Sequence, residues 1–211
     1  RCNANDVEAA MHYRIDGFNF YMGTSQLSRE YNHGKSLREV VKITSSLLQD
    51  VRRNHRYLLI RLSGEDTFRT PLEDIFRVYD ANEDLVDRFG MPDTVGVAQP
   101  YVRNEDGVLS AFEVTSALHE RYPRIPIEGH FQDDLGNALE NAKAAIQAGA
   151  QFMDTTIIGG AERSGLPSMT GLAINLFEID EELFVGYNKS LSYPLNMRFP
   201  ATHISGDFSR C

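Results

Sequence analysis

Short apolar runs alternate along the chain with longer segments in which apolar residues recur every three or four positions. A short apolar run is typical of a buried strand, and the longer spacing is typical of one face of an amphipathic helix. The strands predicted in this way cover residues 18–22, 57–62, 125–131 and 152–158, with a weaker one at 88–91. The predicted helices cover residues 37–51, 71–79, 108–122 and 139–148, the last closed by Gly149 as a C-terminal cap.

This repetition of strand and helix with short connections is the signature of a parallel sheet whose crossover helices cover it. A closed (β/α)8 barrel typically needs about 250 residues, and the chain has 211. We therefore predict an α/β fold, a partial TIM (β/α)8 barrel with about five β/α units. An open doubly wound sheet is the structural alternative.

The character of the chain changes after residue 176. An acidic stretch at residues 178–182 is followed by Pro194 and Pro200, which interrupt an irregular tail. We therefore predict a partial TIM-barrel catalytic domain over residues 1–176 and a C-terminal extension over residues 177–211.

Composition limits the classes of partner. The hydrophobic fraction of 42% and charged fraction of 24% are ordinary for a soluble globular protein, and the net charge of −9 argues against nucleic-acid binding. No apolar run approaches the ~20 residues of a membrane helix, and no signal peptide is visible. The chain starts at Arg1 rather than Met, which indicates processing or truncation. Cys2 and Cys211 are interpreted as free thiols in a reducing compartment, with a disulfide between the termini as the alternative.

Polar clusters follow several predicted strands, where parallel β/α proteins place their functional residues. The clusters are residues 63–66, Asp93-Thr94, residues 128–134 and Glu162-Arg163. Each has a structural explanation by itself: helix N-terminal charge for Glu65-Asp66, a turn for Asp93, and core packing for a lone histidine. Their recurrence at successive strand ends favours a functional site over these separate structural explanations.

Glu128, His130 and Gln132 share one face of a strand because side chains repeat every two residues. Three polar side chains on one face of a buried strand are costly unless they meet a ligand, water or a metal. Histidine supplies a nitrogen ligand for a divalent metal, and a nearby carboxylate fixes its ring. Glutamine offers only a neutral amide oxygen.

Ordered motifs along most of the chain resemble the homocitrate synthase and isopropylmalate synthase family. They include Arg61-Leu62-Ser63-Gly64-Glu65-Asp66, Asp93-Thr94-Val95-Gly96, residues 128–136, and Asp154-Thr155-Thr156 through Gly165. The resemblance implies an acyl-CoA condensing enzyme, which joins acetyl-CoA to a 2-oxo acid, 2-oxoglutarate in homocitrate synthases, and hydrolyses the thioester.

The family positions imply a role for each matching residue. Arg61, Ser63 and Thr94 would bind the distal carboxylate of the oxo acid, and Glu65 and Glu128 would line the pocket as catalytic carboxylates. Arginine suits a carboxylate because its planar fork makes two hydrogen bonds.

The resemblance also implies a divalent metal, Mg, Mn or Zn, with His130 and Gln132 at ligand positions. His203 matches a family histidine that assists acid–base chemistry, and Glu162-Arg163 lies in a loop that looks structural. Family members usually form dimers, which implies a homodimer. A cytoplasmic or mitochondrial location would provide the reducing compartment.

Four departures from the family change these expectations. The family's first strand carries a catalytic arginine and a carboxylate metal ligand, and no such segment precedes Arg1, so about three strands are expected to be absent. Gln132 stands where the family has its second metal-binding histidine, which predicts weak metal binding. The tail at residues 204–209 differs from the family pattern, and Asn19 replaces a carboxylate found in lysine-sensing members.

Three hypotheses follow. The chain is a homocitrate synthase-like acyltransferase of lysine biosynthesis, inactive alone, or a non-catalytic homologue that binds a small carboxylate. The third hypothesis is a fragment that is not independently stable, because an incomplete barrel leaves open strand edges.

Overall fold

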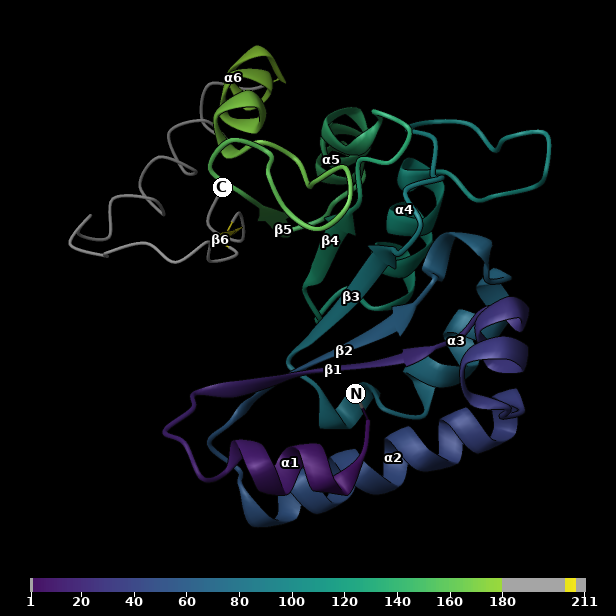
Figure 1. Cartoon of the computed structure of the whole chain (residues 1–211), viewed down its shortest axis with the longest axis vertical. Helices are drawn as coiled ribbons and strands as arrows, with labels where there is room; N and C mark the ends of the chain where they lie inside the picture. Colours follow the sequence, from purple (N-terminus) through teal and green to yellow (C-terminus); the bar gives the residue numbers. More distant parts are fainter. Residues whose placement is uncertain (1, 180–203, 208–211) are drawn as a thin grey trace. The chain divides into compact units, whose positions relative to one another are not determined.

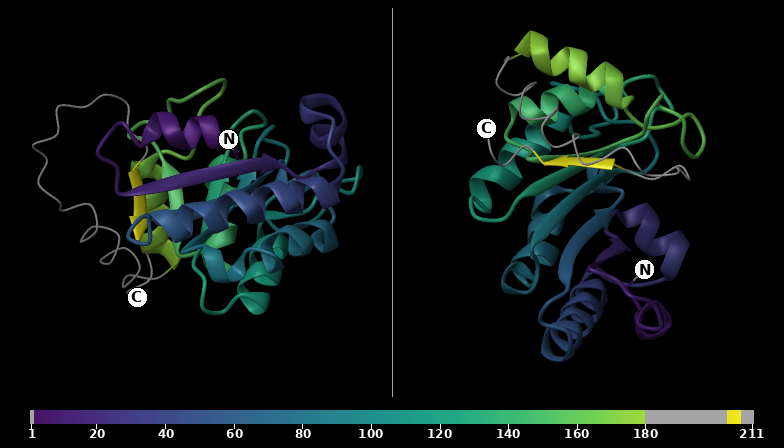
Figure 2. Two further views of the ribbon diagram at one scale, coloured as in Figure 1. Left: turned by 90° about the horizontal axis from the view of Figure 1, so that it is seen from below. Right: turned by 90° about the vertical axis from the view of Figure 1, so that its left-hand side faces the viewer.

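The computed structural model describes residues 2–179 and 204–207 of the chain. It divides into two compact units, Arg1–Pro92 and Asp93–Cys211, which are described in turn. Figure 1 labels their helices and strands, and Figure 2 gives two further views.

The first unit is built on three parallel strands and the helices between them. Its elements are α1 (Ala4–Ala10), β1 (Gly17–Gly23), the π-helical turn η1 (Ser28–His33), α2 (Leu37–Asn54), β2 (Leu59–Glu65), the 3-10 turn η2 (Thr67–Arg69), α3 (Leu72–Asp80), the 3-10 turn η3 (Glu83–Leu85) and β3 (Arg88–Asp93). The last residue of β3 begins the second unit. Helix α2 packs on β1 and α3.

The register of the three strands assigns their residues to two faces. Asn19 is the partner of Arg61, which is the partner of Arg88, and Ser63 is the partner of Gly90. Side chains at partner positions of parallel strands project to the same side of the sheet. The polar residues Asn19, Arg61, Ser63 and Arg88 therefore share one face, and the apolar residues that alternate with them lie on the other.

The apolar face and the helices form the core of this unit. The strand residues in it are Phe20, Ile60, Leu62, Phe89 and Met91, and all are at most 2% exposed. Tyr79 of α3 is fully buried and stacks on Phe89 with 4.1 Å between ring centroids. Its hydroxyl donates to the carbonyl oxygen of Gly90 at 2.5 Å and accepts from the amide of Gly64 at 2.9 Å. Tyr79 thus ties β2 to β3 as well as filling the core.

Helix α2, with 18 residues, begins at a capping box. The Ser36 hydroxyl accepts from the Glu39 amide at 3.3 Å, and the Glu39 carboxylate accepts from the Ser36 amide at 2.8 Å. The hydrogen bonds from Ser36 lower the pKa of Glu39. None of the helices in the described part of the chain is both long and apolar enough to cross a membrane.

The second unit pairs two parallel strands and one antiparallel strand. Its elements are α4 (Ala111–Arg121), β4 (Ile127–Phe131), α5 (Ala138–Gln147), β5 (Phe152–Thr155), α6 (Met169–Ile179) and β6 (Ile204–Asp207). Helix α5 packs on α4, β4 and α6, and Gly149, with a φ of 105°, follows its end as the sequence predicts. Strand β6, yellow in Figure 2, pairs with β5 from Phe152 opposite Asp207 to Thr155 opposite Ile204.

The structure corrects several predicted bounds. Strand β2 runs to Glu65 rather than stopping at Leu62, because the alternation of faces continues through the polar residues. Strand β5 ends at Thr155 rather than Ile158, and Ile158 is 85% exposed in the turn that follows. Helices α1 and α6 were not predicted, and α6 extends across the boundary expected near residue 177.

An ion pair at the start of α4 predicts a pH dependence of stability. Arg103 contacts Glu113 through its Nε at 2.9 Å and lowers the pKa of that carboxyl. The pair therefore stabilises the folded chain above the ordinary pKa of glutamate, and this contribution is lost as the pH falls through the lowered pKa. We expect Glu113→Gln to cost about 0.5 kcal/mol at pH 7, since both side chains are partly exposed.

The measurement is urea unfolding of the wild type and Glu113→Gln at pH 7 and pH 3. The difference between the two proteins should shrink at the lower pH. Glu120→Gln, an exposed change on the same helix, is the matched control and should show no such trend. A difference that persists at pH 3 would mean that the carboxylate charge is not its source.

Candidate functional site

The first part of the candidate site lies on β2 and β3. Arg61 and Ser63 project to the same face of the sheet, next to Gly90. A Cβ at Gly90 would lie 2.6 Å from Nε of Arg61 and would overlap the Ser63 hydroxyl. Glycine at this position therefore leaves the space in which the Arg61 guanidinium lies beside Ser63.

The Ser63 hydroxyl is a buried polar group available to a ligand. Ser63 is 4% exposed, and its Oγ has no hydrogen-bond partner among the described residues. An unsatisfied buried hydroxyl costs about 1–3 kcal/mol, so a ligand oxygen that accepted a hydrogen bond from it would remove this cost. The structure therefore brings together Arg61 and Ser63, two of the three predicted substrate-binding residues.

The end of β2 is held in place by Asp66. This residue has a left-handed φ of 65°, and its side chain is 4% exposed. Its carboxylate accepts two hydrogen bonds from Arg69, both at 2.8 Å, and one from the Ser25 hydroxyl. Glu65, predicted to be catalytic, immediately precedes it as the last residue of β2. The Asp66 cluster is structural and fixes the backbone from which Glu65 projects.

The second unit carries Thr94, the third predicted substrate-binding residue. The buried Asp93 carboxylate accepts from the amides of Val97 and Ala98, both at 3.0 Å. The structural explanation for Asp93, a turn residue, is therefore correct. Thr94 is half-buried within this turn.

Arg163 holds the turn from the loop after β5. It makes a bidentate ion pair with Asp134 at 2.9 and 3.1 Å and donates to the Thr94 carbonyl oxygen at 2.6 Å. Arg163 lowers the pKa of Asp134, and Asp134 raises that of Arg163. A Cβ at Gly96, which has a φ of 67°, would lie 2.6 Å from the Asp134 carboxylate. These contacts support the predicted structural role of the Arg163 loop.

The polar face predicted on β4 is present. Glu128 is 2% exposed and Gln132 is 8% exposed, and the His130 side chain between them is 22% exposed. His130 Nδ1 lies 2.9 Å from the Asp154 carboxylate on β5. Because a carboxylate can only accept this hydrogen bond, Nδ1 carries the hydrogen in the neutral ring, and Nε2 keeps its lone pair. The structure thus adds Asp154 as the residue that orients His130.

Asp154 was missed as a site residue, although its Asp-Thr-Thr motif was noted. Its signal was a carboxylate in an otherwise apolar strand. Residue 154 lies two positions beyond Phe152, the partner of Glu128, so the strand register brings it beside His130.

The donor set does not complete a metal site. His130 offers Nε2, and Gln132 lies next to it with its amide nitrogen 3.5 Å from that atom. The Gln132 amide oxygen is buried and has no partner among the described residues. No group of three His, Cys, Asp or Glu side chains in the described part of the chain could hold a metal ion. One imidazole and one amide oxygen are a poor match to a divalent metal.

Two predicted features cannot be placed. His203 lies outside the described residues. The arrangement of Arg61 beside Thr94 and His130 joins residues of both compact units and stays a prediction.

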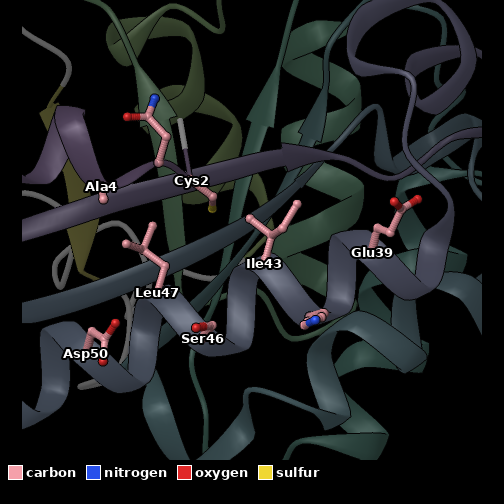
Figure 3. A pocket seen from close by; sticks show the side chains of 9 residues that line it. Cys2, Ala4, Glu39, Ile43, Ser46, Leu47 and Asp50 are labelled. Atoms are coloured by element: carbon pink, nitrogen blue, oxygen red, sulfur yellow. The ribbon is translucent and has the colours of Figure 1, made fainter.

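The first unit also has a pocket whose lining includes none of the predicted site residues. Figure 3 shows this pocket of about 470 Å³, with Cys2 and Ala4 on one side and Ile43, Leu47 and other α2 residues on the other. Burial raises the pKa of the Cys2 thiol to about 12, although the N-terminal charge acts in the opposite direction. The thiol therefore stays protonated at neutral pH and is no nucleophile.

Comparison with known proteins gives the family of the chain. The family model described as HMGL-like matches residues 1–187. The mitochondrial homocitrate synthase of Schizosaccharomyces pombe is 33% identical over 188 residues, which cover 86% of this chain and 41% of that protein. The cytosolic homocitrate synthase isozyme of Saccharomyces cerevisiae is 32% identical, covering 82% and 38%. The 2-isopropylmalate synthase of Methanocaldococcus jannaschii is 28% identical, covering 85% and 33%.

Solved structures give the fold. The HMG-CoA lyase of Brucella melitensis matches with a TM-score of 0.63 at 18% identity, over 84% of this chain and 64% of that one. An HMG-CoA lyase of Acinetobacter baumannii matches with a TM-score of 0.66 at 16% identity, over 84% and 59%. These similarities confirm the predicted fold class, a partial TIM barrel.

The chain spans about two fifths of the length of the homocitrate synthases that it matches. Within that span the family model covers nearly all of the described residues. The chain therefore belongs to the HMGL-like family, as its motifs predicted.

Proposed function

We propose that the chain is part of a homocitrate synthase-like acyltransferase of lysine biosynthesis and binds the 2-oxo acid of that reaction, with 2-oxoglutarate as the oxo acid. The similarity to proteins named homocitrate synthase, at 32–33% identity, supports this activity over the other members of the family. The names of these relatives place them in mitochondria or the cytosol, and we propose the same reducing surroundings for this chain.

The observation that carries the proposal is the pairing of Arg61 with Ser63. A guanidinium over Gly90 and a buried hydroxyl without a partner are suited to the two oxygens of a carboxylate. Thr94, whose turn is fixed by Arg163 and Asp134, is proposed as the third ligand of that carboxylate.

The reaction itself makes one bond and breaks another. The methyl carbon of acetyl-CoA loses a proton and attacks the keto carbon of the oxo acid, whose oxygen gains a proton. Water then hydrolyses the thioester and releases CoA. Glu65 and Glu128 are proposed as the carboxylates that line the pocket, and His203 as the acid–base group, since such groups move protons in transition states.

A metal in this family would polarise the keto group of the oxo acid. His130, oriented by Asp154, and Gln132 are the residues of this chain proposed to face it, and one imidazole with one amide oxygen would hold it weakly. We therefore propose that the chain by itself binds the oxo acid without catalysing the condensation.

A second function, a non-catalytic homologue that binds a small carboxylate, is favoured by one specific observation. Gln132 occupies the histidine position of the family motif, and its buried amide oxygen lacks a partner. Arg61 and Ser63 bind the carboxylate in both proposed functions, so the same binding experiment tests both.

Arg61→Gln tests the binding proposal. We expect it to weaken 2-oxoglutarate binding by at least tenfold, because a charge-assisted hydrogen bond contributes about 1.5–3 kcal/mol. Isothermal titration calorimetry of the purified chain measures the affinity. Arg53→Gln, whose side chain is 71% exposed on α2, removes the same charge elsewhere and should leave binding unchanged. Wild-type affinity in Arg61→Gln would refute the proposed site.

A second assay separates the two functions. The chain is incubated with acetyl-CoA and 2-oxoglutarate, and the free thiol of released CoA is measured. We expect no release above the rate without protein. Turnover by the chain would exclude the non-catalytic reading and show that the site works with Gln132 in place.

A further inference from the structure

Two buried polar atoms lie just beyond the carboxyl ends of β4 and β5 in the second unit. They are Oε1 of Gln132 and Oγ1 of Thr156, and neither has a hydrogen-bond partner among the described residues. Buried polar side chains are nearly always hydrogen-bonded in native proteins. Because parallel β/α proteins bind their ligands at the carboxyl ends of strands, two such atoms at neighbouring strand ends indicate a place for a ligand atom.

The register of β4 and β5 places these two residues opposite each other. This parallel register continues to His130 and Asp154, where Nδ1 lies 2.9 Å from the carboxylate. Two positions further along both chains, the same register brings Gln132 opposite Thr156. Since side chains repeat every two residues, both project to the face that carries the His130–Asp154 pair.

The backbone of Thr156 is held by the loop that follows β5. Its amide donates to the Pro167 carbonyl oxygen at 3.1 Å, and its carbonyl oxygen accepts from the Met169 amide at 2.7 Å. The hydroxyl therefore takes no part in fixing this backbone. Thr156 is half-buried and the His130 side chain is 22% exposed, so a small ligand can approach this face from solvent.

The orientation of the Gln132 amide follows from the state of His130. Nδ1 carries its hydrogen toward Asp154, so Nε2 presents a lone pair, and the Gln132 amide nitrogen lies 3.5 Å from it. The amide thus turns its donor end to the ring, and its oxygen is left as a buried acceptor without a donor. The Thr156 hydroxyl can donate as well as accept.

A hydroxyl group complements this pair of atoms. It can donate its hydrogen to Oε1 of Gln132, while its oxygen accepts from the Thr156 hydroxyl. A keto oxygen can only accept, so it would satisfy Thr156 and leave the Gln132 oxygen unpaired. An unpaired buried acceptor weakens binding, and the two strand ends therefore discriminate between a hydroxyl and a keto group.

We propose that Gln132 and Thr156 form a hydroxyl subsite in which Gln132 is the specificity-determining residue, so that the chain binds a 2-hydroxy acid more tightly than the corresponding 2-oxo acid. This inference rests on the proposed function, which places His130 and Gln132 beside the keto group. In that reaction the keto oxygen gains a proton and becomes a hydroxyl. The subsite thus favours the class of acid that the condensation produces over the class that it consumes.

The test compares two acids that differ only in the oxygen function at carbon 2. Affinities of the purified chain for 2-oxoglutarate and for each enantiomer of 2-hydroxyglutarate are measured by calorimetry, with EDTA present to remove metal. The wild type should bind one enantiomer about tenfold more tightly than 2-oxoglutarate, the effect of one additional hydrogen bond to a buried group.

Variants of the two residues should act differently. Gln132→Met keeps the length of the side chain without the amide oxygen, so it should weaken binding of 2-hydroxyglutarate alone and remove the preference. Thr156→Val removes a donor that serves both acids, so it should weaken both and keep their ratio. Gln49→Met and Thr170→Val, at exposed positions of α2 and α6, are the matched controls and should bind both acids as the wild type does.

The outcomes separate this inference from the proposed function. If Gln132→Met does not fold by circular dichroism, Gln132→Asn, whose oxygen is drawn back by one methylene, carries the test and should also lose the preference. Equal wild-type affinities for the two acids, or a preference that survives the Gln132 variants, would overturn the inference. The proposed function would still stand if Arg61→Gln weakened both acids. Binding of neither acid by the wild type would overturn both.

Discussion

Replacing Asp66 with alanine is expected to lower the free energy of unfolding by about 2–3 kcal/mol. The change leaves Arg69 without its bidentate partner and removes the acceptor of the Ser25 hydroxyl. Breaking a buried ion pair from one side typically costs about 3–5 kcal/mol. The value should fall below that range because the Arg69 side chain is 32% exposed and can regain water. Alanine also tolerates the left-handed backbone at this position less well than aspartate.

Urea unfolding of the purified chain measures this effect. Asp66→Asn keeps the shape and the tolerance of a left-handed backbone but removes the charge, so it should cost less than alanine. Asp84→Ala, in the exposed part of η3, is the matched control and should change stability by under about 0.5 kcal/mol. If Asp66→Ala unfolds like the control, then the Arg69 pair contributes nothing to holding the end of β2.

Residues that act within one strand could be predicted from the sequence. Alternation alone placed Glu128, His130 and Gln132 on one face, and the structure confirms that Glu128 and Gln132 are buried polar residues there. The same rule applies to Arg61 and Ser63. The period of a strand is a local property, so it is readable without any tertiary information.

Residues that act across strands could not be predicted in the same way. Asp154 reaches His130 because β4 and β5 pair in one particular register. Register depends on the packing of the whole sheet. Family motifs gave the position of Asp154 but not its partner.

Residues 204–207 show a third kind of feature that the sequence did not predict. Residues 204–207 were noted as a departure from the family pattern, and they form β6, which pairs antiparallel with β5. An unpaired strand edge is an aggregation hazard. The pairing covers one edge of β5, so that edge is not one of the open strand edges on which the fragment hypothesis depends. A segment of four residues is too short to show a clear periodicity, so its long-range pairing with β5 could not be predicted from the sequence.

Replacing Gln132 with histidine is expected to raise the affinity for Zn²⁺ by on the order of 100-fold or more. Residue 132 lies two positions beyond His130 on the same face, so a second imidazole would stand beside Nε2 of the first. The amide oxygen that it replaces is a weaker ligand. Even outer-shell partners change metal affinity by roughly 10–100-fold, and a direct ligand should do at least as much.

Competition with a chromogenic chelator measures the Zn²⁺ affinity of each purified variant. Gln49→His, which adds a histidine at an exposed position of α2, controls for adventitious binding. Adding Asp154→Asn to Gln132→His should remove about tenfold or more of the gain, because the His130 ring would lose the carboxylate that orients it. An affinity of Gln132→His equal to that of Gln49→His would show that position 132 does not face the metal. A gain that survives Asp154→Asn unchanged would instead keep the site and remove Asp154 from it, since only the orientation of His130 links that carboxylate to the ion.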